Sequence, residues 1–238
     1  MTTDLDFATA GFFPLSCDKF KFKGEFDGAG HTISNAVIMG INNNVGFIRY
    51  ATGGASIHDM VIDGSFTGSA KIGGVIGFVR DGGEVLLTNV INRANVRATG
   101  SSDANAAGLF GCAVDNTKVT VTNCANMGEV KGQDGNCAAF AGWTQTGTTF
   151  TNCWNSGAIY NIEGSAQLYR NTGAVTATNC FDLTNVGNQG TKVDASTLAT
   201  GELCYELNGD QSDIHWYQNL SGTMDAYPVP FDSHAQLS

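Results

Sequence analysis

Residues 121–130 read VTNCANMGEV, and residues 150–159 read FTNCWNSGAI, the same pattern displaced along the chain. Residues 87–96 (LTNVINRANV) match nearly as well, whereas residues 57–66 and 177–186 are weaker copies and residues 33–35 (ISN) open the series. The first asparagine or aspartate of each copy returns at 35, 59, 89, 123, 152 and 179. A period of this length is typical of solenoids, propellers and repeat arrays.

A second motif lies between these copies and keeps the same order and spacing. It reads VGFI at 45–48, GGVIG at 73–77, AGLFG at 107–111 and AAFAG at 138–142, with a faded copy, AQLY, at 166–169. Several short apolar segments per period, separated by Gly and Asn, favour strands over helices. A propeller blade needs more residues than one period supplies. The sequence therefore predicts an all-β fold, a right-handed parallel β-helix of about six turns.

Equivalent residues of successive turns should stack in columns, because each strand pairs with its counterpart one turn on. The two Asn positions fit tight turns, since Asn tolerates the left-handed backbone conformation and its amides can bond along a stack. Two columns are apolar or thiol-bearing and are expected inside. They are Ala36, Met60, Val90, Cys124, Cys153 and Cys180, and Phe47, Val75, Leu109, Phe140 and Leu168. Free cysteines behave as small buried hydrophobes, which fits these positions. We expect free thiols, although stacked neighbours such as Cys124 and Cys153 would lie within the Cα range of a disulfide.

The repeats end near residue 193, which divides the chain into repeats at 1–193 and a C-terminal part at 194–238. Residues 195–208 (ASTLATGELCYELN) are the one credible helix, and Gly209 supplies a stop. We expect this helix and the aromatic tail to cap the last turn, because a β-helix must cover its exposed strand edges.

The formal charge of −10, with only 12 Lys plus Arg, disfavours nucleic acid and anionic membranes as partners. No apolar run is long enough to span a membrane. The first residues show neither the basic nor the apolar region of a signal peptide. This leaves a cytosolic protein or part of an exported one.

Three stretches resemble the GLUG-motif β-helix proteins: residues 22–33 (FKGEFDGAGHTI), 108–111 (GLFG) and 151–157 (TNCWNSG). Members of that family are mostly large secreted or surface-attached bacterial proteins. They include adhesin-like proteins and some bacterial immunoglobulin A proteases, in which the repeats lie outside the catalytic domain. The resemblance implies an extracellular or cell-surface location and a larger surface protein as the context of this chain.

No catalytic set, cofactor site or metal site is predicted. Glycosidases need two carboxylates across a scissile bond, but the neighbours of Asp59 and Asp63 in their columns are not acids. Asp27 and His31 are flanked by Gly and are expected to fix a bend. The four His residues lack metal-ligand spacing, and no Cys-x-x-Cys pair occurs.

Four aromatic residues in successive turns are candidates for sugar binding: Trp143, Trp154, Tyr160 and Tyr169. Packing within the core or a turn is the alternative for Trp154, whose column is otherwise apolar. The loops at 97–106 and 131–136 are polar and variable, as recognition loops on a rigid scaffold tend to be.

The leading hypothesis is a non-catalytic extracellular β-solenoid domain for adhesion or for binding a glycan, a mucin or a surface protein. A polysaccharide lyase or glycoside hydrolase is the first alternative, motivated by the fold alone. The second is a structural spacer or stalk.

Overall fold

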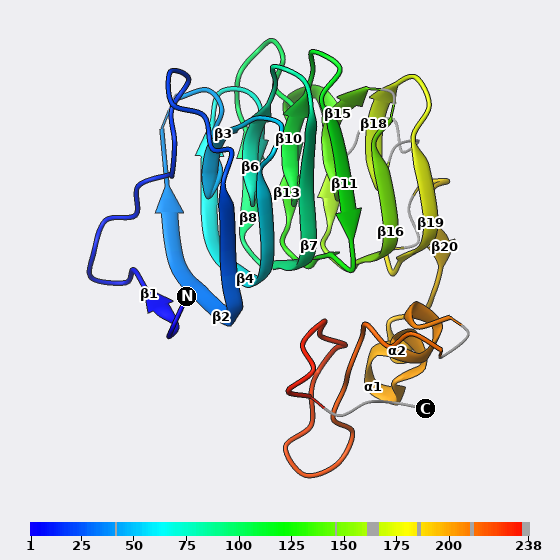
Figure 1. Ribbon diagram of the computed structural model, residues 1–238. Helices are drawn as coiled ribbons and strands as arrows, with labels where there is room; N and C mark the ends of the chain where they lie inside the picture. The colour runs from blue at the N-terminus through cyan, green and yellow to red at the C-terminus, as the bar shows by residue number, and fades with distance from the viewer. Residues whose placement is uncertain (41, 146, 161–166, 185–186, 210–211, 235–238) are drawn as a thin grey trace.

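A computed structural model describes residues 1–40, 42–145, 147–160, 167–184, 187–209 and 212–234. Parallel strands stack into a β-solenoid of about six turns, which run from the N-terminal end to the C-terminal end of the stack in Figure 1. The pairings between the named strands are all parallel among the described residues. The predicted β-helix is confirmed.

Three sheets form the walls of the solenoid. The 12-stranded sheet contains β1 (Leu5–Asp6), β2 (Glu25–Ile38), β4 (Ser56–Gly68), β7 (Glu84–Asn92), β8 (Asn95–Ala98), β11 (Lys118–Thr122), β12 (Ala125–Asn126), β13 (Val130–Lys131), β16 (Thr149–Asn155), β17 (Ile159–Tyr160), β19 (Thr176–Asp182) and β20 (Thr191–Lys192). The five-stranded sheet contains β3 (Ile48–Ala51), β6 (Ile76–Val79), β10 (Phe110–Ala113), β15 (Ala141–Gln145) and β18 (Tyr169–Thr172). The three-stranded sheet contains β5 (Ile72–Gly73), β9 (Ala106–Ala107) and β14 (Cys137–Ala138), which follows the 3₁₀ turn Gln133–Gly135.

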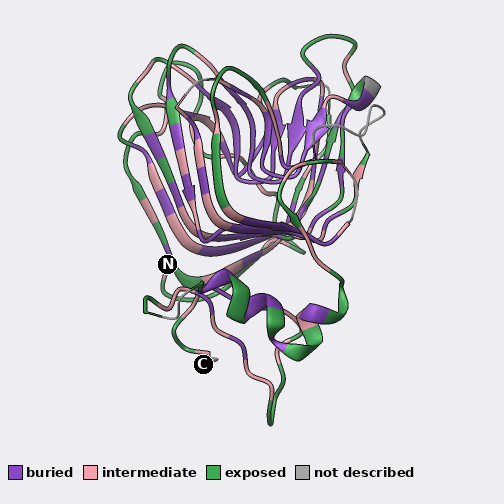
Figure 2. Cartoon of the chain, turned by 90° about the vertical axis from the view of Figure 1, so that its right-hand side faces the viewer, coloured by how far each residue is buried: buried purple, intermediate pink, exposed green. Residues whose placement is uncertain are grey.

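The residues of the two predicted apolar columns form part of the buried interior. Every member of both columns is buried and belongs to one continuous hydrophobic cluster. Figure 2, a view along the stack, shows most of the buried residues on the strands, whereas the loops at the strand ends are largely exposed. All seven cysteines are free, and six of them are buried.

The first turn is aligned differently from the prediction. His31 lies opposite Met60 and Ile33 opposite Ile62, so Asn35 is not the counterpart of Asp59. The register shifts between Asp27 and His31. Ala29 and Gly30, inside that shift, have φ values of 51° and 77°. They take the left-handed conformation that Asp59 has in the next turn.

The first Asn of each later copy forms an outer ladder at a sharp bend. Asp59, Asn89, Asn123, Asn152 and Asn179 all have φ between 50° and 55°. Each Asn amide donates to the side-chain oxygen of its neighbour one turn earlier, at 2.7–3.2 Å. Asn suits this position because its short polar side chain lowers the cost of a left-handed backbone.

The second Asn forms an inner ladder that is fully buried. Asn92 donates to Asn126, Asn126 to Asn155, and Asn155 to Asp182, at 2.8–2.9 Å. Gly108 of the second motif packs directly against it, because a Cβ there would come within 1.9 Å of Asn126 Oδ1. The two sequence motifs therefore meet inside the solenoid at this contact.

The C-terminal segment (residues 194–209 and 212–234) forms two short helices instead of one. They are α1 (Ser196–Thr200) and α2 (Glu202–Leu207), separated by Gly201 with φ of 78°. No helix among the described residues is long and apolar enough to cross a membrane.

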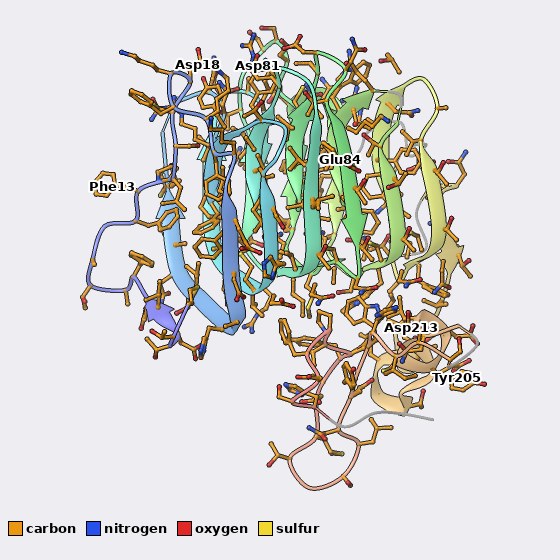
Figure 3. All side chains as sticks on the ribbon, viewed as in Figure 1. Phe13, Asp18, Asp81, Glu84, Tyr205 and Asp213 are labelled. Atoms are coloured by element: carbon orange, nitrogen blue, oxygen red, sulfur yellow. The ribbon has the colours of Figure 1, made fainter. Side chains whose placement is uncertain are left out.

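This segment lies along a flank of the solenoid, not over the end of its last turn (Figure 1). It covers an outward-facing apolar column of five turns, in a second hydrophobic cluster that includes Trp216 and Val229. The column consists of Val61, Ile91, Ala125, Trp154 and Phe181. The segment reaches back to the first turn, where Phe231 approaches Gly30. Figure 3 shows Tyr205, which is 48% exposed, projecting from α2 away from the stack.

Candidate functional site

Trp154 is fully buried, which corrects its prediction as a ligand-binding ring. It packs edge-on against Trp216, with ring centroids 6.3 Å apart, and lies 6.2 Å from Tyr227. Its column faces outward, but the C-terminal segment covers it. This geometry fits the alternative interpretation of Trp154, in which its ring packs within the protein.

The two tyrosines lie apart from each other. Tyr169 is half-buried and stacks on the core residue Phe150, with ring centroids 5.5 Å apart. Tyr160 is 48% exposed on β17, and the ammonium group of Lys131 lies 5.3 Å from its ring centre. A hydrogen bond to Glu129 and the charge of that carboxylate raise the pKa of the Tyr160 hydroxyl. Only Tyr160 of the pair presents its ring to solvent.

Trp143 is half-buried and lines a pocket of about 260 Å³ outside the five-stranded sheet. The guanidinium group of Arg170, from the next turn, lies 5.4 Å from the indole centre. Arg170 Nη1 also donates to Asn105 Oδ1 at 2.7 Å and to the Gly142 carbonyl oxygen at 3.1 Å. These bonds fix the cation against the ring.

The two polar loops singled out in the sequence supply the rim of this Trp143 pocket. Asp103 and Asn105 come from the loop at 97–106, and Asn136 comes from the loop at 131–136. Lys71 Nζ pairs with Asp103 Oδ2 at 3.0 Å. Buried Cys112 forms part of the floor, and burial raises the pKa of its thiol to about 12, so it stays protonated at neutral pH.

A larger pocket of about 490 Å³, here called the flank pocket, lies between the first turns and the C-terminal segment. Asp27, Asp59 and Asn89 line its inner wall. The outer wall comes from residues 214–215, 217 and 230–233, which include His215, Tyr217, Phe231 and Asp232.

His58 lies beside this pocket and is surrounded by carboxylates. Its Nδ1 atom lies 2.7 Å from Asp59 Oδ2 and 3.7 Å from Asp27 Oδ1, and its Nε2 atom lies 3.1 Å from Glu25 Oε1. One donor atom each from Asp27, His58 and Asp59 fall within 4.8 Å of one another. Burial lowers the pKa of His58, but the hydrogen bonds to Asp59 and Glu25 outweigh it, so the pKa is raised.

The sequence analysis missed this cluster because it aligned the first turn on Asn35. The observed register places Asp27 opposite His58, and Glu25 opposite Ser56. The cluster could have been found by aligning Asp27-Gly28 of the first turn with His58-Asp59 of the second turn. The predicted bend is present: Asp27 Oδ1 accepts the Ala29 backbone N–H at 2.7 Å. His31 pairs with Asp4 instead.

Comparisons with known proteins give information on the fold. No known family profile matches the chain, and no curated protein matches its sequence. A solved structure described as "a putative immunoglobulin A1 protease from Bacteroides ovatus" is similar over 96% of this chain and 84% of that one. The TM-score is 0.57 at 19% sequence identity. The chain therefore shares the fold of that protein, and its resemblance to GLUG-motif proteins stays a prediction.

Proposed function

We propose that this chain is a non-catalytic, extracellular β-solenoid module that binds glycans, as part of a larger bacterial surface protein. The observation that carries the proposal is the Trp143 pocket. It combines a half-buried indole with guanidinium, amide, ammonium and carboxylate groups on one rigid face. Mucin-type glycans and glycosylated surface proteins are the partners that such a pocket would serve.

The chemistry of the pocket suits a sugar. A pyranose ring offers an apolar C–H face to an aromatic side chain and a fringe of hydroxyls to hydrogen-bonding groups. Binding sites of this kind combine apolar lining with a few placed polar groups. Here Asn105 and Asn136 supply amides at the rim, and the strand β15 holds Trp143 in place.

The test is a glycan and mucin array probed with the purified chain and two variants. Trp143→Ala should abolish the signal, because it removes the aromatic wall of the pocket. Tyr160→Ala is the matched control, since Tyr160 is another exposed aromatic residue that does not line the pocket. Thermal unfolding of both variants verifies folding. No signal for the wild type, or equal loss in both variants, contradicts the proposal and favours a structural spacer.

A polysaccharide-active enzyme is the second candidate, and the flank pocket is the observation that favours it. Asp27 and Asp59 both line the pocket, with carboxylate oxygens within 4.8 Å of each other. Retaining glycosidases hold their two carboxyl groups about 5–5.5 Å apart. Release of reducing sugar from a polysaccharide panel, lost in Asp59→Asn and kept in Trp143→Ala, would support this candidate over the first.

A further inference from the structure

We propose that Asp27, His58 and Asp59 form a binding site for a divalent transition-metal ion of the zinc type, at the edge of the flank pocket. The donor set is one imidazole nitrogen and two carboxylate oxygens, from neighbouring turns of the solenoid. An imidazole ligand distinguishes this set from the all-oxygen sets that calcium and magnesium prefer. The inference is independent of glycan binding at Trp143.

The two distances from the imidazole nitrogen to the carboxylate oxygens are close to those around one shared ion. Zinc binds imidazole nitrogen and carboxylate oxygen at about 2.0–2.2 Å, which places two tetrahedral ligand atoms about 3.3 Å apart. The distances from His58 Nδ1 to Asp59 Oδ2 and to Asp27 Oδ1 are 2.7 Å and 3.7 Å, on either side of that value. A metal ion would take the place of the proton now shared between His58 and Asp59, and binding would release that proton at pH values where His58 is charged.

Outer partners already orient the ligands. Metal-bound histidines usually donate their other ring N–H to a carboxylate or carbonyl, which fixes the tautomer. Glu25 Oε1 is in that position, 3.1 Å from His58 Nε2. The Asn89 amide donates to Asp59 Oδ1 at 2.7 Å, which leaves Oδ2 toward the imidazole. The Ala29 backbone N–H donates to Asp27 Oδ1, the oxygen that faces His58 Nδ1, and so fixes the orientation of that carboxylate.

Charge favours a cation at this point. Glu25, Asp27 and Asp59 share one imidazole, and no described Lys or Arg forms an ion pair with any of them. The N-terminal ammonium group of Met1 donates to the backbone carbonyl oxygen of Asp27, not to its carboxylate. Three protein ligands leave a fourth position for water or a substrate, as in catalytic zinc sites. Both carboxylates also form part of the inner wall of the flank pocket, so a small molecule in that pocket would lie next to the ion.

The experiment uses the tag-free chain after dialysis against a chelator. Co²⁺ is titrated with its visible absorption as the readout, and Zn²⁺ is titrated by calorimetry. We expect one ion per chain and at least tenfold weaker binding in His58→Gln and in Asp59→Asn. Glu25→Gln should weaken binding by about tenfold through the outer shell. His31→Gln is the matched control, because His31 lies in the first turn and pairs with Asp4 outside the cluster.

The same titrations can overturn the proposal. Absence of Co²⁺ absorption and of Zn²⁺ heat at millimolar metal would do so, as would wild-type affinity in His58→Gln. Equal loss in His31→Gln would show that the ion sits elsewhere. If His58→Gln fails to fold, Glu25→Gln, at an exposed outer partner, decides the matter by the same readouts. Retention of array binding in the His58 variant would separate this site from the glycan proposal.

Discussion

The indole nitrogen of Trp216 donates a hydrogen bond of 3.2 Å to the carbonyl oxygen of Asn152, which ties the C-terminal segment to the outer ladder of the solenoid. Asn179 Nδ2 makes a second tie, to the Leu207 carbonyl oxygen at 2.9 Å. Both bonds lie at the border of the second hydrophobic cluster. The segment is therefore docked by polar and apolar contacts together.

Trp216→Ala should loosen this docking by about 4 kcal/mol, because it removes a fully buried indole and its hydrogen bond. The measurement is amide hydrogen exchange at Tyr217 and Val229. The backbone N–H of each residue donates to the carbonyl oxygen of the other at 2.9 Å. Met224→Ala is the control, since Met224 is in the same segment and 70% exposed. Unchanged protection at these two amides in Trp216→Ala would contradict the docking described here.

The backbone conformation of the outer ladder can be tested at Asn123, whose φ is 52°. Asn123→Gly and Asn123→Ala both remove the ladder hydrogen bonds, but only the glycine variant keeps free access to the left-handed region. We expect the alanine variant to be less stable than the glycine variant by about 1–2 kcal/mol in urea unfolding. Equal stability would mean that the bend does not need this conformation.

The interior columns of the later turns could be predicted from the sequence. In a regular stack each residue lies next to the residue at the same position of the next repeat. The first turn could not be predicted, because the register shift at residues 28–30 depends on local backbone geometry that a periodic pattern hides. The position of the C-terminal segment could not either. Trp154 and Ile91 are apolar whether they face the core or face a covering segment, and only the structure tells these cases apart.

Of the candidate functional sites, one could also be located from the sequence and the other could not. Trp143 and both polar loops were singled out from the sequence, and the structure places them around one pocket. That they bind a ligand stays a prediction. The cluster around His58 was not singled out, because its members meet only in the corrected register. Sequence spacing alone places Asp27 and His58 more than thirty residues apart, with nothing to show that they face each other.

The inner ladder ends on a buried ion pair that can be tested by a double-mutant cycle. Lys192 Nζ lies 2.6 Å from Asp182 Oδ2, and Asp182 is fully buried. Lys192→Met should cost about 3 kcal/mol in urea unfolding, because it leaves a buried carboxylate without its cation. Lys23→Met, at an exposed position, is the control and should change stability by less than about 0.5 kcal/mol.

Adding Asp182→Asn to Lys192→Met should restore more than half of the loss. An amide there continues the Asn92, Asn126 and Asn155 ladder and can still accept the hydrogen bond that Asn155 donates at 2.9 Å. A double variant less stable than Lys192→Met would contradict this account of how the ladder ends.

We expect the buried thiol of Cys124 to make the protein less stable at alkaline pH. Burial raises the pKa of Cys124 from 9.0 to about 12, so the folded chain keeps this proton while the unfolded chain loses it above pH 9. The stability contribution is then complete below pH 9 and falls as the pH rises from 9 toward 12.

In urea unfolding under reducing conditions, the free energy of unfolding of the wild type should drop from pH 8 to pH 10 by about 1 kcal/mol more than that of Cys124→Ala. Comparing the pH dependence of the two proteins cancels the cavity that the substitution creates and the titration of tyrosines and lysines, which both chains share. An identical drop in the two proteins would mean that Cys124 ionises as readily in the folded state as in the unfolded one, and its place inside the column would then be wrong.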